Sequence, residues 1–252
     1  MEIVLITVGG LLILWFAFYF LGWLFLMLAG WTVPMKKEYS KPSRFYSALF
    51  NYGYWMICRH GRVRIHTSGT EKIPYAADNN GQRFLFISNH RSKFDNMIHS
   101  ISMKKEPLAF ISKTANFKIP IGRHFMIRSC YQPVEQGNVK SGLNAVLKSI
   151  SLIKSGATSI GVFPEGTRSK TTDLLEFKPG CFKIAEKTKC PIVVGVTQGT
   201  ERIHKNWPWK KTDVYFNIID VIKPEQYEGK GSVELCDYIF NEINNFLKKN
   251  PK

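Results

Sequence analysis

The stretch SNHRSKFDN, residues 88–96, places the residue types of a general base and its partner close together. His90 directly follows the apolar run Phe84–Ile87, and Asp95 comes five residues later. Such a run is typical of a strand that is buried on both faces, and open α/β sheets bind ligands at the carboxyl ends of their strands. An imidazole whose Nδ1 proton is held by a carboxylate keeps Nε2 free as a base. No G-x-S-x-G elbow accompanies the pair, so the stretch predicts a base that acts on a substrate hydroxyl.

The spacing decides how these two side chains can meet. Five residues of one helix turn through about 500°, so His90 and Asp95 would point about 140° apart. They can meet only if a turn separates them, with His90 before a helix and Asp95 at its N-cap. The helix N-terminus would then favour the ionised carboxylate. The alternative is that Asp95 is only a helix cap and that the histidine lies near it without a catalytic role.

A second strand-like run leads into a polar turn at SIGVFPEGTRS, residues 159–169. Gly166 allows a backbone to approach a ligand closely, and Arg168 carries a planar fork that suits phosphate or carboxylate. Glu165 can accept hydrogen bonds from a polyol or orient Arg168. The alternative is a Pro/Gly turn with an exposed ion pair.

Together the two stretches resemble the glycerolipid acyltransferase family, in particular bacterial 1-acylglycerol-3-phosphate acyltransferases. The first motif of that family, N-H-x4-D, is similar to Asn89, His90 and Asp95, and its F-P-E-G-T-R-S motif matches Phe163–Ser169 in full. Further similar segments are ISKTANFKIPIGR, EFKPGCFKIAE and PIVVGVTQGT. The resemblance covers roughly residues 83 to 200.

This resemblance implies transfer of a fatty acyl group from a thioester to the sn-2 hydroxyl of lysophosphatidate, which gives phosphatidate in phospholipid synthesis. His90 would be the general base and Asp95 its orienting partner. The substrate-binding residues implied are Lys113, Glu165, Gly166, Thr167 and Arg168: Arg168 with Lys113 for the acceptor phosphate, Glu165 and Gly166 for the glycerol. The family implies no metal and no bound cofactor, and the acyl donor is acyl-carrier protein or acyl-CoA as a co-substrate.

Two departures from the family pattern concern the acceptor head group. In PVEQGN, the neutral Gln136 stands where a phosphate-binding Arg is expected, and Val194 and Gly195 occupy a region that usually has a second Pro. Lys113, Arg123 or Arg128 are candidates for the missing charge. A different lysophospholipid or an aminolipid therefore stays open as the acceptor. A non-catalytic adaptor that binds anionic lipid is a further alternative, which the intact His90, Asp95 and Arg168 disfavour.

The N-terminal segment predicts membrane residence. Residues 3–33 contain no Lys, Arg, Asp, Glu or His, and about 20 apolar residues suffice to cross a bilayer. A secretory signal peptide fits poorly, because Glu2 is the only charge before the run and the run is too long. Interface-seeking aromatic residues lie at Trp15, Tyr19, Trp23 and Trp31. Glycines at 9, 10, 22 and 30 leave open one tilted span or two helices in a shallow hairpin.

Positive charge dominates the chain, with 35 Lys and Arg against 19 Asp and Glu and a formal net charge of +16. Many of these residues follow the apolar segment: Lys36, Lys37, Lys41, Arg44, Arg59, Arg62 and Arg64. Positive flanks stay cytoplasmic, so we expect the catalytic domain on the cytoplasmic side of the inner membrane. The basic surface suits an acidic acyl donor. Nucleic-acid binding is disfavoured, because the charge clusters beside the membrane segment and no nucleic-acid-binding motif is present.

The remaining pattern predicts an α/β fold with a mixed or largely parallel central sheet flanked by helices. Residues 1–58 would form the membrane-embedded and membrane-docking helical segment, and residues 59–252 the acyltransferase domain. The expected strands are 62–69, 83–89, 107–113, 159–166, 191–199 and 214–222, and the expected helices are 45–58, 95–104, 139–155, 180–189 and 232–248. The five cysteines are expected to be free thiols in a reducing compartment, and Asp78–Gly81 to form a turn.

Overall fold

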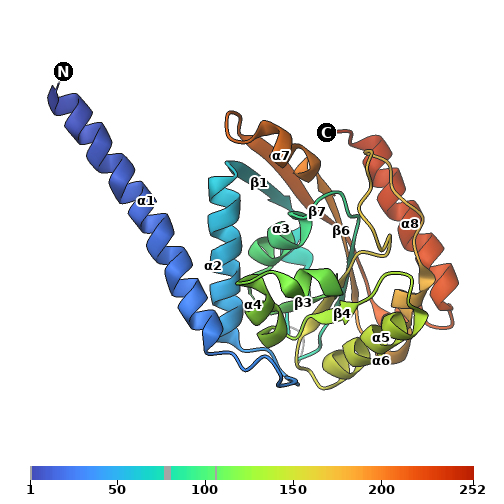
Figure 1. Ribbon diagram of the computed structural model, residues 1–252. Coiled ribbons are helices and arrows are strands. Elements are labelled where there is room, and N and C mark those ends of the chain that lie inside the picture. Colours follow the sequence, from blue (N-terminus) through green and yellow to red (C-terminus); the bar gives the residue numbers. More distant parts are fainter. Residues whose placement is uncertain (1, 77–80, 106) are drawn as a thin grey trace.

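The computed structural model describes residues 2–76, 81–105 and 107–252, and these form a mixed α/β fold around one central sheet (Figure 1). Within this part of the chain the strands are β1 (Val63–Ser68), β2 (Leu85–Ser88), β3 (Leu108–Lys113), β4 (Gln132–Val134), β5 (Ser159–Val162), β6 (Ile192–Gln198) and β7 (Thr212–Ile222). The helices are α1 (Glu2–Trp31), α2 (Arg44–His60), α3 (Asp95–Ser102), α4 (Gly122–Arg128), α5 (Val139–Lys154), α6 (Lys183–Thr188), α7 (Ile203–Asn206) and α8 (Ser232–Lys249).

The described strands pair in the order β1-β7-β6-β2-β5-β3-β4. All neighbours run parallel except β6 and β7, which are antiparallel. Helices α2, α3 and α4 lie on one side of the sheet, and α5, α6 and α8 lie on the other (Figure 1). The expected fold class, a largely parallel sheet flanked by helices, is confirmed.

The three central strands explain why the sequence folds in this way. Every residue of β2, β5 and β6 is buried, as expected for strands covered by helices on both faces. In β7, which lies nearer the edge, buried and half-buried residues alternate along most of the strand. Because β2 is parallel to both β5 and β6, the segments that follow these three strands gather at one edge of the sheet.

Each expected strand and helix overlaps an observed one, although the strand expected over 159–166 ends at Val162. Three of the described strands and α-helices were not predicted, among them the four-residue helix α7. Strand β4 has three residues, with Pro133 among them, and α4 has seven, so both are too short for a periodic signal. The expected turn at Asp78–Gly81 lies largely outside the described residues. The five cysteines are free, as expected.

Helix α1 is continuous from Glu2 to Trp31, so its glycines do not divide it into two helices. It is long and apolar enough to cross a membrane, and nearly all of its apolar window is exposed. It projects beyond the body at its N-terminal end and packs beside α2 towards its other end (Figure 1).

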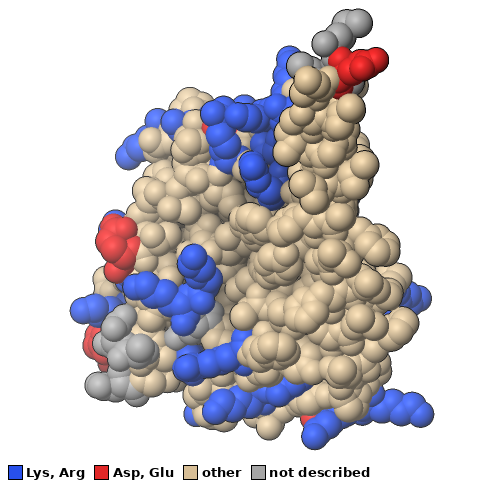
Figure 2. Space-filling model, turned by 90° about the vertical axis from the view of Figure 1, so that its left-hand side faces the viewer, with Lys and Arg blue, Asp and Glu red and all other residues tan. Residues whose placement is uncertain are grey.

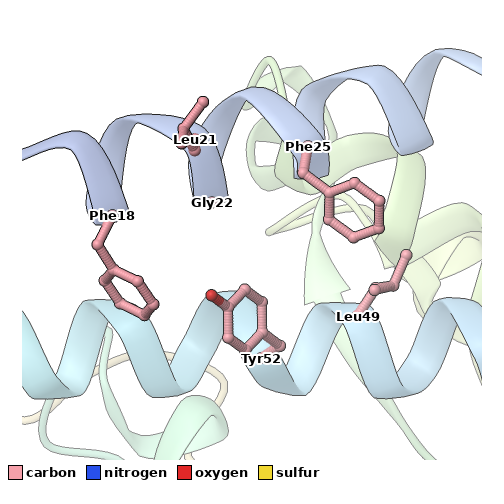
Figure 3. A pocket seen from close by; sticks show the side chains of 6 residues that line it. All are labelled: Phe18, Leu21, Gly22, Phe25, Leu49 and Tyr52. Atoms are coloured by element: carbon pink, nitrogen blue, oxygen red, sulfur yellow. The ribbon is translucent and has the colours of Figure 1, made fainter.

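Gly22 lets α1 approach α2 closely. A Cβ at Gly22 would lie 2.8 Å from Met56 Cε and 3.3 Å from Tyr52 Oη. Beside this contact an open, apolar cleft of about 500 Å³ separates the two helices. It is lined by Phe18, Leu21, Gly22, Phe25, Leu49 and Tyr52 (Figure 3). A larger side chain at position 22 would therefore push the membrane helix away from the body.

Candidate active site

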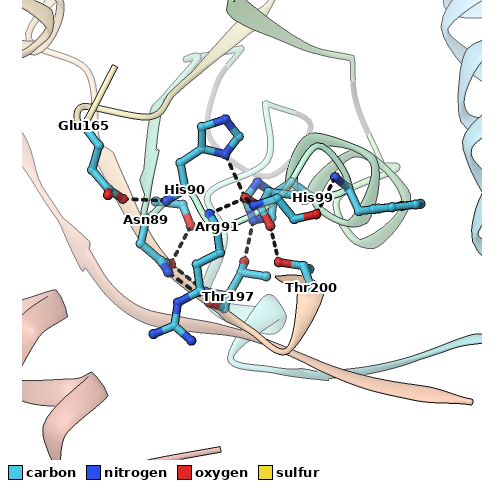
Figure 4. Close-up of polar contacts among 11 residues, drawn as sticks. Asn89, His90, Arg91, His99, Glu165, Thr197 and Thr200 are labelled. Carbon is cyan, nitrogen blue, oxygen red and sulfur yellow. Dashed lines mark hydrogen bonds and ion pairs between the residues drawn. The ribbon is translucent and has the colours of Figure 1, made fainter. Parts of the chain in front are cut away.

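The structure brings His90 and Asp95 together across a turn, with Nδ1 of His90 2.7 Å from Oδ2 of Asp95 (Figure 4). The expected N-cap role of Asp95 is wrong, because Phe94 is the N-cap and Asp95 is the first residue of α3. The carboxylate instead turns back, and Oδ2 accepts the backbone N–H groups of Arg91 and Ser92, each at 2.7 Å. The short turn between strand and helix is thus wrapped around one carboxylate oxygen.

Asp95 is completely buried, and its second oxygen, Oδ1, accepts the Thr200 hydroxyl at 2.5 Å. Burial alone would raise the pKa of Asp95. The hydrogen bond and charge of His90 oppose that effect, as do the donors Ser92 and Thr200, and the pKa lies below its ordinary value. An ionised Asp95 holds a proton on Nδ1 of His90, which leaves Nε2 as the acceptor.

The ring of His90 is fixed by the second motif. It stacks on Phe163 with ring centroids 4.1 Å apart and an interplanar angle of 15°. Because Nδ1 is bonded to Asp95 and one face is covered by Phe163, the edge that carries Nε2 is the one left for a ligand. The side chain of His90 keeps 18% of its surface exposed, whereas that of Asp95 keeps none.

The second motif also holds the backbone of His90. Glu165 Oε1 accepts the His90 N–H at 2.6 Å, and the Ser169 N–H donates to the His90 carbonyl at 2.9 Å. The other oxygen of Glu165 accepts the Leu175 N–H at 3.1 Å, and Glu165 is only 3% exposed. Glu165 therefore orients the base and its loop. No ion pair in the described part of the chain joins it to Arg168.

A buried polar network ties this edge together, and sequence reasoning missed most of it. The Asn89 amide bonds both backbone groups of Thr197, donating to its carbonyl at 2.9 Å and accepting its N–H at 2.8 Å. The Thr197 hydroxyl lies 2.6 Å from Nε2 of His99. His99 follows Asp95 by one turn of α3. Burial lowers the pKa of His99 to about 3, so this ring is neutral. Thr197 and Thr200 lie in the family-like segment PIVVGVTQGT, but no local pattern indicated their contacts or that of His99.

Three cations gather around Gly166, which has a φ of 66°. Burial, and then the positive charge of Arg168, lower the pKa of Lys113. A Cβ at Gly166 would lie 3.2 Å from Nζ of Lys178, which belongs to the family-like segment EFKPGCFKIAE but was not expected to bind phosphate. Among the described ion pairs, none gives Lys113, Arg168 or Lys178 a carboxylate partner. Like charges held together in this way favour an anionic ligand.

The other residues that the sequence analysis related to substrate binding make contacts of other kinds. Gln136 is at the site, where its Nε2 donates to the Gly166 carbonyl at 2.7 Å. Arg128 donates to the Lys41 carbonyl and lies over the ring of Tyr39. It therefore stabilises the segment between α1 and α2. Thr167 is exposed in the loop beside Gly166. Within the described ranges, no three His, Cys, Asp or Glu side chains form a group that suits a metal ion.

Glu165 gives a testable pH dependence of stability. Burial raises its pKa from 4.5 to about 7, against the opposing hydrogen bonds from His90 and Leu175. Between these two pH values the unfolded chain loses the Glu165 proton and the folded chain keeps it, so folding weakens as the pH rises. Relative to Glu165→Gln, which does not titrate, the free energy of unfolding of the wild type should fall by as much as about 3 kcal/mol from pH 4.5 to pH 8. Urea unfolding in detergent at several pH values measures this difference, and a difference that rises with pH would contradict it.

A buried carboxylate, a paired imidazole and unpaired cations at the carboxyl edge of an α/β sheet define a site for general-base chemistry on an anionic substrate. A family model described as Acyltransferase matches residues 64–196, more than half of the chain, so this protein belongs to that acyltransferase family.

Individual relatives extend this comparison. The chain is 37% identical over 161 residues to "1-acyl-sn-glycerol-3-phosphate acyltransferase BAT2, chloroplastic" of Brassica napus, covering 63% of this chain and 45% of that protein. It is 29% identical over 171 residues to a 1-acyl-sn-glycerol-3-phosphate acyltransferase of Borreliella burgdorferi, covering 66% of each. The chain thus matches less than half the length of the plant relative.

A solved structure has the same fold. The crystal structure of the 1-acyl-sn-glycerophosphate (LPA) acyltransferase PlsC from Thermotoga maritima aligns with a TM-score of 0.59 at 25% sequence identity. The alignment covers 80% of this chain and 81% of that one.

Proposed function

We propose that this protein transfers a fatty acyl group from an acyl thioester to the sn-2 hydroxyl of lysophosphatidate and so forms phosphatidate. The observation that carries the proposal is the His90–Asp95 pair, whose free Nε2 edge lies on the same sheet edge as the unpaired cations around Gly166. The names of the relatives, which specify this acceptor, support it. The chain itself supplies a base and an anion site, which are the two features that such an acceptor requires.

The reaction follows from the free edge of His90. Nε2 takes the proton of the acceptor hydroxyl while the oxygen attacks the thioester carbonyl. The tetrahedral intermediate then expels the thiolate, which receives the proton from the imidazolium, so an ester and a thiol are formed. Asp95, buried and ionised, stabilises the imidazolium in between. General-base assistance of this kind contributes about 10²–10⁴-fold to the rate.

Arg168 and Lys113 are proposed to bind the acceptor phosphate. Lys178, at Gly166, would supply a charge in the region where Gln136 stands in place of the expected Arg. Gly166 and Thr167 would then border the glycerol, which was the contact also expected for Glu165. Since both oxygens of Glu165 already accept backbone N–H groups, we now assign it the positioning of His90.

Arg168→Ala should raise the KM for lysophosphatidate by roughly 10- to 100-fold, because a hydrogen bond to a charged group contributes about 1.5–3 kcal/mol. The value of kcat should change much less, since no hydrogen bond or ion pair of the described residues joins Arg168 to His90 or Asp95. Initial rates against the surface concentration of lysophosphatidate in mixed micelles measure both constants. Arg64→Ala, on β1, is the matched control. An unchanged acceptor KM would remove the role given to Arg168.

The acyl donor and the membrane arrangement belong to the same proposal. Acyl-carrier protein or acyl-CoA would supply the acyl group, and both are acidic, which suits a chain of net charge +16. Helix α1 would hold the enzyme in the cytoplasmic membrane with the catalytic domain on the cytoplasmic side. We keep the division into a membrane segment, 1–58, and an acyltransferase domain, 59–252, and note that Phe50 and Tyr54 of the first pack into the core of the second.

The decisive experiment is acyl transfer by the purified protein in mixed micelles, with a labelled acyl thioester and a panel of lysolipids. Transfer to lysophosphatidate alone would support the proposal. Transfer mainly to a lysolipid without a phosphomonoester would keep the chemistry and change the acceptor, an outcome that the neutral Gln136 makes worth testing. Absence of transfer from either donor to any acceptor would favour the adaptor that only binds anionic lipid.

A further inference from the structure

Between α7 and β7 the chain exposes two tryptophans among lysines. In the Trp207–Lys211 loop (sequence WPWKK), Trp207 is 46% exposed and Trp209 is 84% exposed. Lys210 and Lys211 complete the loop, and Lys205 precedes it on α7. A tryptophan can bury 150–250 Å² of surface, so two exposed ones within three residues leave a large apolar area uncovered. Neither the fold nor the proposed chemistry uses this loop.

The loop is held rigidly in its exposed position. The Trp207 indole donates to the His60 carbonyl at 3.2 Å, and Arg62 Nη1 donates to the Pro208 carbonyl at 3.0 Å. The Lys210 N–H donates to the Asn206 carbonyl at 2.8 Å, and the Thr212 N–H donates to the Arg62 carbonyl at 3.1 Å. The end of α2 and the start of β1 therefore fix the loop, and they present Trp209 outwards.

A chain of aromatic rings connects this loop to the membrane helix. The ring of His60 lies 5.6 Å from that of Trp207 and 5.9 Å from that of Trp15 on α1, measured between centroids. In Figure 1, α7 lies near the upper end of α2, and the N-terminal part of α1 extends beyond the level of that end. A bilayer that holds α1 would thus meet the Trp207–Lys211 loop directly beside the helix.

The surroundings of the loop are strongly basic. Arg59 and Arg62 come from the end of α2 and the residues after it, and Lys205, Lys210 and Lys211 come from α7 and the loop. Lys and Arg side chains gather beside the upper, projecting part of α1 (Figure 2). None of the ion pairs among the described residues involves these five cations, and Asp213 at the start of β7 is paired with Arg64 and His66. The remaining cations are therefore available to negative lipid head groups, which attract each of them.

The loop also lies at the edge of the sheet that carries the candidate active site. It follows β6, whose carboxyl end carries Thr197 and leads to Thr200, and β6 runs parallel to β2, which leads to His90. Contact of the loop with a lipid surface therefore brings that surface to the same edge as the base.

We infer that the Trp207–Lys211 loop, with Arg59, Arg62 and Lys205, is a docking site for the head-group layer of an anionic bilayer. The tryptophan rings enter the interface, where such rings are enriched, and the cations contact the anionic lipids. The inference rests on the proposed membrane residence of α1. An acidic acyl-carrier protein is the competing occupant, but the adjoining membrane helix and the exposed tryptophans favour lipid.

The test uses the full-length protein in vesicles of phosphatidylcholine alone or with phosphatidylglycerol. The emission of Trp209 is obtained as the difference between wild type and Trp209→Phe. In anionic vesicles we expect this signal to be shielded from acrylamide and quenched by lipids brominated near the head groups. Lys210→Ser with Lys211→Ser should raise the phosphatidylglycerol fraction that gives half-maximal quenching. The matched control, Lys183→Ser with Lys187→Ser on α6, should not.

Two outcomes would overturn the inference. One is a Trp209 signal that acrylamide quenches equally with and without vesicles and that brominated lipids do not quench. The other is shielding that appears only when acyl-carrier protein is added, which would make the loop a protein-docking site. Transfer activity in mixed micelles is measured separately. Its absence while Trp209 is still quenched would contradict the proposed reaction and leave the docking site standing.

Discussion

Replacing His90 by alanine should lower acyl transfer to lysophosphatidate by about 10²–10⁴-fold, the usual contribution of a general base. Nε2 of His90 is the ring nitrogen that the protein leaves free, since Nδ1 is bonded to Asp95 and Phe163 covers a ring face. The acceptor KM should change little, because the cations around Gly166 remain. Initial rates with labelled thioester in mixed micelles give both constants.

The matched control is His66→Ala. This histidine is half exposed on β1 and pairs with Asp213, away from the candidate site. The His66 variant should keep its activity, and both variants should remain in the membrane fraction through α1. Near-normal transfer by His90→Ala would refute the mechanism.

Asp95→Asn should lower kcat by about 10⁴-fold, the size of the effect when the carboxylate of a Ser-His-Asp site becomes an amide. An amide can keep the local geometry, with its oxygen towards Arg91 and Ser92 and its nitrogen towards the Thr200 hydroxyl. It cannot stabilise the imidazolium that forms when His90 takes the proton. The defect should therefore lie in the chemistry and not in the fold.

A defect in the chemistry is separated from a defect in the fold by measuring kcat together with thermal unfolding in detergent. We expect a small change in unfolding temperature for Asp95→Asn and a larger one for Asp95→Ala, which leaves the N–H groups of the turn without their acceptor. An Asp95→Asn variant that turns over at the wild-type rate would show that the carboxylate charge is not used.

The sequence was informative wherever the interaction is local or the burial is complete. His90 and Asp95 are five residues apart, so turn geometry alone predicted their contact. The continuous apolar run Phe84–Ile87 predicted a strand buried on both faces, and β2 is fully buried. The direction in which Asp95 points was missed, because N–H groups before the helix compete with those inside it for the same carboxylate.

The rest of the site depends on contacts between distant segments. Thr200 is 105 residues from Asp95, and Gln136 reaches Gly166 across 30 residues, so no local pattern reveals either contact. The basic residues near the membrane segment were treated as one flank. The structure places Arg44 and Arg59 at opposite ends of α2, and only the far end meets the Trp207–Lys211 loop.

The two bonds that hold the backbone of His90 have a consequence for how such an enzyme can change its acceptor. Glu165 accepts the backbone N–H of His90, and the Ser169 N–H donates to the His90 carbonyl. Both residues belong to the loop that carries Arg168. If Arg168 binds the acceptor as proposed, the loop that recognises the head group also positions the imidazole. A graft of this loop from an enzyme with another head-group preference would then also move His90, and we expect a redesign of specificity to need side-chain changes that keep Glu165 and Ser169 in place.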